Sequence, residues 1–291
     1  MTFDRLLRLF LCSIAALVVA SSLTGFARLT GFARQQPNVL SSENDFANDF
    51  KDVPCKHNQR LEAVRVLFMR MGADASEITI TKFRGAENLV VKRKGLTDET
   101  IIIGAHYDFA DLGCGAIDNW SGIVAMSHIY RSVRAVEQKK TVLFVAFDNE
   151  EKGLVGARAM ANAIAKEDLP RYCAMINIDS FGLAPPFAMT NTSSGSLIRV
   201  AEDAATALHM PFYSAPIGGA DADSSAFLAR KIPAVTFAGI GPDWPSILHT
   251  VKDQKAKVDA PSAYMGYKLA LAVWDRVDQA DCGKFREPAS K

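Results

Sequence analysis

Three apolar runs, each leading to a histidine or to acidic residues, constrain the fold of this 291-residue chain most strongly. The runs and the residues that follow them are 100–105 before His106, 142–147 before the pair Glu150–Glu151, and 174–178 before Asp179. Continuous runs of β-branched and aromatic residues of this length predict strands that are buried on both faces, as in a parallel sheet. Because ligands bind outside the carboxyl ends of such strands, we expect these polar side chains to gather at one edge of the sheet.

The rest of the chain alternates between helix and strand patterns. Apolar residues at helical spacing predict helices over residues 58–71, 121–136, 154–166, 196–209, 223–229 and 260–277. Further strands are predicted over 77–83, 87–92 and 234–237, the first two as a hairpin around Gly85. This order predicts an α/β fold, a three-layer sandwich in which a mostly parallel mixed sheet carries helices on both faces.

Residues 1–27 have the pattern of an export signal. Arg5 and Arg8 precede an uncharged apolar stretch from residue 9 to residue 23, which is the order found in secretory signals. The stretch is shorter than the ~20 residues of a spanning helix. A cleaved signal peptide and an uncleaved membrane anchor both place the bulk of the chain in the periplasm or the extracellular space. Three further segments are expected: a linker over 28–52, one folded domain over 53–285 and a tail over 286–291.

Four cysteines lie beyond the export signal, namely Cys55, Cys114, Cys173 and Cys282. An even number of cysteines in an exported chain indicates disulfides. Cys173 lies near the start of its predicted strand, so it is ~20 Å from the strand end that carries Asp179, at ~3.3 Å per residue. Cys114 lies near that end, and the Cα atoms of a disulfide must come within ~7 Å. We therefore disfavour Cys114–Cys173 and expect Cys55–Cys282, which would tie the start of the domain to its end.

The chain is nearly neutral overall. Its 33 basic and 32 acidic residues give a formal net charge of +1. The sequence has no basic stripe with interleaved aromatic residues, so a nucleic-acid partner is not expected. It makes no prediction about an oligomeric state.

The side chains expected at the sheet edge have the chemistry of metal ligands. Unpaired carboxylates that crowd in a partly dry cleft repel each other and take up protons. A pair of divalent cations would remove this repulsion. The residues concerned are His106, Asp118, Glu150, Glu151, Asp179 and His249. Together they indicate a two-metal hydrolase.

Five segments carry a resemblance to a known family. They are residues 106–108, 115–122, 147–156, 177–179 and 249–250. In their order and spacing these segments resemble the zinc aminopeptidase family M28, over roughly residues 55–280. The resemblance implies a phosphorylase/hydrolase-like α/β fold and two zinc ions per chain.

The resemblance also implies a role for each side chain. The implied metal ligands are Asp118 as the bridge, His106 and Asp179 on one ion, and Glu151 and His249 on the other. Glu150 would be the catalytic residue, a general base that takes a proton from the metal-bound water and later delivers it to the leaving amine. Asp108 is expected to accept a hydrogen bond from the imidazole of His106 and so fix its tautomer. The predicted function is an exported zinc aminopeptidase that removes N-terminal residues from peptides.

The chain departs from the family at residues 222–227. Relatives commonly have Ser-Asp-His there, whereas Ser224 replaces the histidine in this sequence. Residues 217–221 also lack the tyrosine with which several relatives polarise the scissile carbonyl, so the oxyanion donor is left unassigned. Candidates for the wall of the site and for a substrate pocket are Asp223, Trp120, Phe181 and Trp244.

A glutaminyl cyclase is the alternative, because it shares this fold and the same kinds of ligand while using one zinc ion. Leu248 stands where a cyclase is expected to have tryptophan, and the short passage from Glu151 to Gly156 is closer to peptidases. A thiol nucleophile at Cys114 lacks an ordered base, a serine hydrolase lacks its Gly-x-Ser-x-Gly turn, and a non-catalytic domain would have lost ligands. The remaining histidines are expected to be structural or surface residues, namely His57, His128 and His209.

Overall fold

The computed structural model describes residues 40–286. The expected export signal (1–27), the expected linker up to residue 39 and the tail from residue 287 onwards lie outside this part of the chain. A compact unit begins at Ser41, before the domain start expected at residue 53.

The first helix, α2 (Glu43–Asn48), lies in the segment that the sequence assigns to a linker. Phe46 of this helix is completely buried, and its ring contacts the rings of Tyr264 and Tyr267. Ser42 caps the helix by accepting a hydrogen bond from the N–H of Asp45 at 3.0 Å. Burial of one aromatic side chain therefore draws the end of the expected linker into the folded unit.

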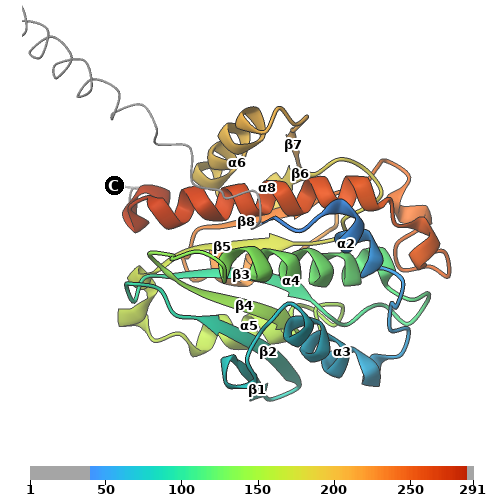
Figure 1. The fold of residues 1–291 in the computed structure, drawn as a ribbon, viewed down its shortest axis with the longest axis horizontal. Helices are drawn as coiled ribbons and strands as arrows, with labels where there is room; N and C mark the ends of the chain where they lie inside the picture. Colours follow the sequence, from blue (N-terminus) through green and yellow to red (C-terminus); the bar gives the residue numbers. More distant parts are fainter. Residues whose placement is uncertain (1–39, 287–291) are drawn as a thin grey trace, which may run out of the picture. The chain divides into compact units, whose positions relative to one another are not determined.

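An eight-stranded mixed sheet forms the centre of the unit (Figure 1). Its strands are β1 (Ile78–Phe83), β2 (Ala86–Arg93), β3 (Thr100–His106), β4 (Thr141–Phe147), β5 (Tyr172–Ile178), β6 (Phe187–Met189), β7 (Ser214–Ala215) and β8 (Ala234–Ala238). In spatial order they are β1-β2-β4-β3-β5-β8-β6-β7. The central strands β4, β3, β5 and β8 pair in parallel, and antiparallel pairs lie on either side of them. The expected α/β fold with a mixed sheet is confirmed.

Helices cover both faces of the sheet. The α-helices after α2 are α3 (His57–Arg70), α4 (Ser121–Val133), α5 (Val155–Ala163), α6 (Gly195–Ala207), α7 (Ser224–Leu228) and α8 (Ala260–Gln279). Short helical turns lie at Ala75–Glu77, Ala116–Trp120, Lys166–Arg171, Thr190–Thr192, Trp244–Ser246, Lys255–Lys257 and Cys282–Phe285. Each predicted helix is present, with ends that differ by a few residues. Among the helices of the described chain, none has the length and apolar character needed to cross a membrane.

The two faces follow from the alternation of side chains along β4. The ring of Phe144 contacts Phe68 of α3 and Tyr130 of α4. Phe147, three residues further on, lies on the opposite face and contacts Phe227 of α7. Because both faces are buried, β3, β4 and β5 consist mainly of apolar residues. Their carboxyl ends meet at one edge of the sheet.

The two disulfides pair Cys55 with Cys114 and Cys173 with Cys282. The expected pairing Cys55–Cys282 is therefore wrong, whereas the exclusion of Cys114–Cys173 is confirmed. The course of α8 explains the difference. Asp259, just before the helix, donates to a backbone carbonyl just after β5, and Cys282, just after the helix, reaches the start of β5. A helix of 20 residues is ~30 Å long, enough to return the chain along the whole strand.

Candidate metal centre

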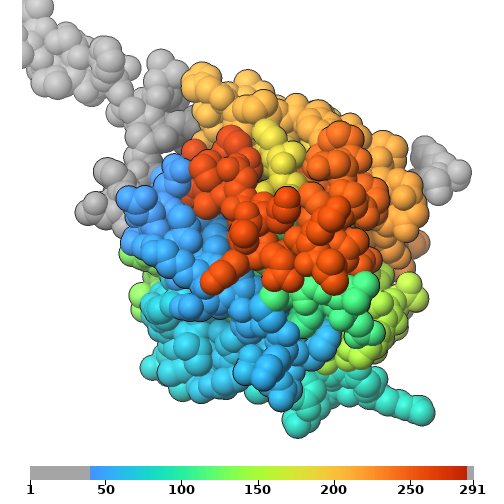
Figure 2. Space-filling view, turned by 90° about the vertical axis from the view of Figure 1, so that its right-hand side faces the viewer, coloured from blue at the N-terminus to red at the C-terminus, as the bar shows by residue number. Residues whose placement is uncertain are grey.

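Five segments deliver the predicted site residues to one edge of the sheet. His106 is the last residue of β3, the glutamate pair follows β4, and Asp179 follows β5, and these three strands are neighbours. Asp118 lies in the helical turn before α4, and His249 lies in a loop after β8. Figure 2 shows this end of the molecule, where the orange segment around residue 250 lies against the green segment around residue 115.

Asp118 lies between the two histidines. Its Oδ1 is 3.1 Å from Nε2 of His106, and its Oδ2 is 2.9 Å from Nε2 of His249. Two further carboxylates extend the cluster: Asp179 Oδ1 is 3.5 Å from Nε2 of His106, and Glu151 Oε2 is 3.1 Å from Nε2 of His249. The structure thus brings the five candidate ligands together as two groups that share one carboxylate. A pair of bridged cations would require this arrangement.

The two histidines differ in exposure. His106 is 1% exposed, whereas the side chain of His249 is 55% exposed. Hydrogen bonds to Asp118 and Glu151 raise the pKa of His249 to about 10. Burial opposes a charge on His106, but nearby carboxylates, led by Glu150, raise its pKa well above the usual value. These shifts favour the protonated form of His249 at neutral pH in the metal-free protein.

Glu150 and Asp118 belong to one cluster but differ in their protonation. Burial raises the pKa of Glu150 to about 10, although the charge of His106 opposes this effect. Burial would also raise the pKa of Asp118, but hydrogen bonds from His106 and His249 hold it below its usual range. Titratable groups whose pKa values are pushed apart in this way are typical of acid–base sites.

The charges and donor atoms of the cluster fit a divalent metal. Within residues 40–286, no lysine or arginine forms an ion pair with any of its four carboxylates. Oε1 of Glu151 is buried and has no hydrogen-bond partner in the described chain. Imidazole nitrogens and carboxylate oxygens are the ligands that Zn²⁺ uses at sites with an open position. Both the donor set and the lack of a lysine or arginine partner within residues 40–286 therefore fit zinc.

Asp108 supports the cluster from the end of β3. Nδ1 of His106 lies 3.2 Å from the backbone oxygen of Asp108 and 3.4 Å from its Oδ1. The expected contact is present, with the main-chain oxygen as the nearer acceptor. The Asp108 carboxylate also accepts hydrogen bonds from the N–H groups of Glu150 and Glu151, at 3.0 Å and 3.2 Å. This second role joins the ends of two strands.

Two further supporting residues are missed by the sequence interpretation. The buried carboxylate of Asp253 accepts hydrogen bonds from two N–H groups of the turn that carries Asp118. The buried guanidinium of Arg60 donates to two carbonyl groups at the start of that turn. Arg60 lies on the buried face of α3 with Val64 and Leu67. A charged residue on this otherwise apolar face was the feature of the sequence that could have indicated its role. For Asp253, the signal was its position four residues after the histidine of its loop.

The aromatic residues suggested for a substrate pocket are mostly core residues. Trp120 is 3% exposed, and its ring lies against the guanidinium of Arg60. Phe181 is 1% exposed and lies directly against Gly266 of α8. These two rings therefore pack in the core. Trp244 is half-buried beside an apolar cluster, so it differs from the other two.

Asp223 lies just before α7 and is completely buried. Neither of its carboxylate oxygens has a hydrogen-bond partner among residues 40–286. Burial raises its pKa well above the usual value. The charge of His106 opposes this shift, and the charge of Asp179 adds to it. The next residue, Ser224, which stands in place of the family's histidine, donates its hydroxyl to the carbonyl of Thr192 at 2.9 Å.

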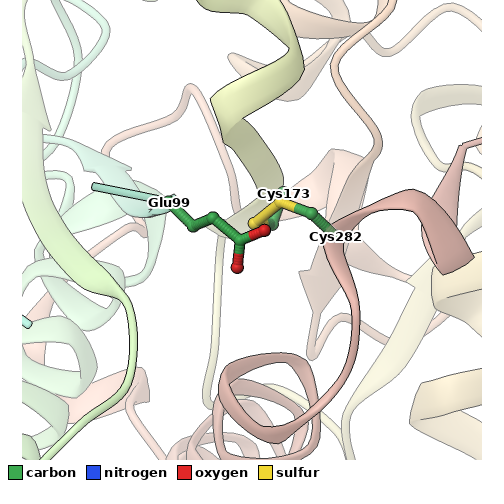
Figure 3. Close-up of side chains that lie close together, drawn as sticks. All are labelled: Glu99, Cys173 and Cys282. Atoms are coloured by element: carbon green, nitrogen blue, oxygen red, sulfur yellow. A yellow bond between two sulfur atoms is a disulfide. The ribbon is translucent and has the colours of Figure 1, made fainter. Parts of the chain in front are cut away.

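A second group of potential ligands does not fit a metal. Glu99 lies beside Cys173 and Cys282 (Figure 3). The two cysteines form a disulfide, so neither offers a thiolate. Glu99 pairs with Nζ of Lys140 at 3.3 Å. Cys114 is also bridged, which excludes it as a nucleophile.

The three remaining histidines have structural or surface positions, as expected. His128 is buried, and its Nε2 lies 2.9 Å from Oδ2 of Asp49. The ring of His57 stacks on Phe109, and His209 is exposed after the end of α6.

Comparisons of the sequence with known proteins find peptidases. The model of a family described as Peptidase family M28 matches residues 88–273. Aminopeptidase YwaD of Bacillus subtilis is 29% identical over 143 residues, which are 42% of this chain and 31% of that protein. The chain thus spans about a third of the length of this curated relative.

Two solved structures share the fold. A zinc aminopeptidase from Bacillus subtilis superposes with a TM-score of 0.60 at 22% identity, over 69% of this chain and 53% of that chain. A glutaminyl cyclase from an Acidobacteriales bacterium superposes with a TM-score of 0.68 at 18% identity, over 81% of this chain and 92% of that chain.

Proposed function

Since the chain belongs to peptidase family M28, we propose that it is an exported zinc aminopeptidase, which hydrolyses the N-terminal peptide bond of peptide substrates. The similarity to aminopeptidase YwaD of Bacillus subtilis supports the substrate class. The similarity in fold to a zinc aminopeptidase supports the choice of metal.

One observation carries the proposal. Side chains from five separate segments converge so that the carboxylate of Asp118 lies within 3.1 Å of one imidazole and within 2.9 Å of another. A folded protein rarely crowds carboxylates without lysine or arginine partners unless a cation neutralises them.

The residues that would hold zinc follow from these contacts. Asp118 would be shared by two ions, His106 and Asp179 would complete one, and Glu151 and His249 would complete the other. Zinc bound there would lower the pKa of a water molecule toward ~7 and polarise the carbonyl of the substrate. His249 must release its extra proton before it can act as a ligand.

Glu150 would move the protons of the reaction. The two glutamates are neighbours in the turn after β4, where Oε2 of Glu151 lies 3.1 Å from Nε2 of His249 and the charge of Glu150 acts on His106. Glu151 is therefore free to bind metal while Glu150 faces the reacting water. The carboxylate of Glu150 would take a proton from this water and deliver it to the amine that leaves. Burial of Glu150 favours the protonated state that the second step needs.

Export is supported by the cysteines. All four cysteines of the described chain form disulfides, and structural disulfides persist mainly in oxidising compartments outside the cytoplasm. The basic and apolar pattern of residues 1–27 is consistent with this location, either as a cleaved signal or as an anchor.

A combined measurement of metal content and activity tests the proposal. We expect two zinc ions per chain by mass spectrometry, and release of nitroaniline from aminoacyl nitroanilides that stops when EDTA is added. One zinc ion with release of pyroglutamate from peptides with N-terminal glutamine would identify the alternative, a glutaminyl cyclase. Glu150→Gln is the control, because it should lose the activity while it keeps the metal.

A further inference from the structure

We propose that Asp253 is a positioning residue that fixes Asp118 relative to His249 before any metal binds. The inference rests on the proposed function, in which these two residues are zinc ligands. Two segments are involved: the bridge turn, residues 114–118, and the histidine loop, residues 249–253.

Both carboxylate oxygens of Asp253 accept hydrogen bonds from the bridge turn. Its Oδ1 accepts a hydrogen bond from the N–H of Ile117 at 2.7 Å, and its Oδ2 accepts one from the N–H of Asp118 at 3.1 Å. Asp253 is 1% exposed, so water does not compete for these bonds. The shared carboxylate is thus anchored through its own backbone.

The bridge turn needs such an acceptor because its backbone is not helical at the critical residues. The φ and ψ angles are −111° and 90° at Asp118 and −137° and 43° at Asn119. Backbone N–H groups in such a turn lack the partners that a regular helix or strand supplies, and a buried N–H without an acceptor is strongly unfavourable. Asp253 supplies the acceptors for two of them.

Asp253 is also tied to the histidine loop and brings it to the bridge turn. Its N–H donates to the carbonyl oxygen of Thr250 at 3.1 Å, which closes a turn right after His249. Its carbonyl oxygen accepts a hydrogen bond from the N–H of Cys114 at 2.8 Å. The two backbones approach so closely at Gly113 that an added Cβ there would lie 2.4 Å from the Thr250 oxygen. A shift of Asp253 would therefore move both ligands.

Arg60 holds the same turn through groups of the opposite polarity. Its guanidinium donates to the carbonyl oxygens of Cys114 and Gly115, the second at 3.0 Å. The Cζ atom lies 4.6 Å from the ring centre of Phe109 and 5.1 Å from that of Trp120. Arg60 and Asp253 form no ion pair with each other in the described part of the chain. Instead, the guanidinium contacts carbonyl oxygens of the bridge turn, and the carboxylate contacts its N–H groups.

Asp253→Asn in the full chain tests the inference. The amide keeps one acceptor oxygen, but its NH₂ group replaces the other. This NH₂ group cannot accept a hydrogen bond, so one backbone N–H of the bridge turn loses its partner. We expect the variant to bind Zn²⁺ ~10–100-fold more weakly in competition with a chelating dye. We also expect an altered visible absorption spectrum after substitution with Co²⁺, because this spectrum reports the geometry of the ligands. Asp203→Asn removes the same charge from an exposed position of α6 and is the matched control.

The parent protein separates the two ways of failing. If it binds no zinc, the proposed function fails. If it binds zinc while Asp253→Asn keeps the parental dissociation constant and cobalt spectrum, the positioning role is overturned. Should Asp253→Asn not fold by circular dichroism, Asp253→Glu decides, since it keeps the charge and adds one methylene. A shifted cobalt spectrum in Asp253→Glu supports the role, and a parental spectrum overturns it.

Discussion

The carboxylate of Asp108 accepts a hydrogen bond from the backbone N–H of Glu150 at 3.0 Å. This bond links the end of β3 to the segment after β4, so that the residue expected to orient His106 also orients the proposed general base. The same carboxylate holds the N–H of Glu151 at 3.2 Å. One buried side chain thus sets the direction of three functional groups.

Replacement of Asp108 should therefore weaken the site at several points. We expect Asp108→Asn to lower both zinc affinity and kcat/KM by ~10–100-fold, because the outer support of metal ligands typically has effects of this size. Dye competition and nitroanilide kinetics measure the two quantities. Asp111→Asn, in a fully exposed position of the same loop, should leave both unchanged. Equal values for Asp108→Asn and the parent protein would contradict the multiple role.

The two adjacent glutamates should fail in different ways. Glu150→Gln is expected to lower kcat by ~10²–10⁴-fold, the range for a lost general base, while the zinc content stays the same. Glu151→Gln should instead lower the zinc content, since an amide is a poorer zinc ligand than a carboxylate. Mass spectrometry and steady-state kinetics on both variants show the difference. The assignment is wrong if Glu150→Gln loses metal while Glu151→Gln retains it.

Metal uptake should depend on pH through His249. Its pKa is raised to about 10 by Asp118 and Glu151, so in the metal-free protein it is protonated at pH 7. Zinc must displace this proton, and the apparent affinity should therefore rise as the pH increases from about 6.5 towards about 10. The stability that this proton gives to the metal-free fold is present below pH 6.5 and is lost as the pH rises through about 10.

Proton release on addition of Zn²⁺ to weakly buffered metal-free protein at pH 8, followed with an indicator dye, measures this exchange. His209→Gln, which changes an exposed histidine, should release as many protons as the parent protein. A zinc affinity that is constant between pH 6.5 and pH 8.5 would exclude the exchange.

Each disulfide should contribute separately to stability. The bridges close sequence separations of 59 and 109 residues, and removal of a native disulfide of this kind typically costs about 2–5 kcal/mol. We expect the double replacement of Cys173 and Cys282 by serine to lower the free energy of unfolding in urea by this amount. Loss of Cys55–Cys114 should weaken zinc binding as well, because Cys114 belongs to the turn that carries Asp118. Urea curves that do not change on reduction would contradict a stabilising role.

The positions of the polar residues at the sheet edge could be predicted because they depend on local rules. Apolar runs define β3, β4 and β5, and parallel strands bring their carboxyl ends together, so His106 and Asp179 had to lie close to each other. The family resemblance supplied the two residues from loops, Asp118 and His249.

The contacts of Asp253 and Arg60 could not be predicted because they depend on how loops pack. Asp253 reaches an N–H group 136 residues away in the sequence, and Arg60 reaches carbonyl groups across 54 and 55 residues. The disulfide pairing was missed for the same reason. Its outcome depended on the direction of α8, which brings Cys282 back to the start of β5.

The two imidazoles of the proposed zinc site differ in exposure, so one side of this site opens more easily than the other. His106 ends a central strand and is 1% exposed, so its displacement requires disruption of the central strands of the sheet. His249 is 55% exposed on a loop, and a local opening there needs no disruption of the sheet. A chelator should therefore remove zinc at the rate at which the loop of His249 opens locally. This opening should be much faster than global unfolding of the protein.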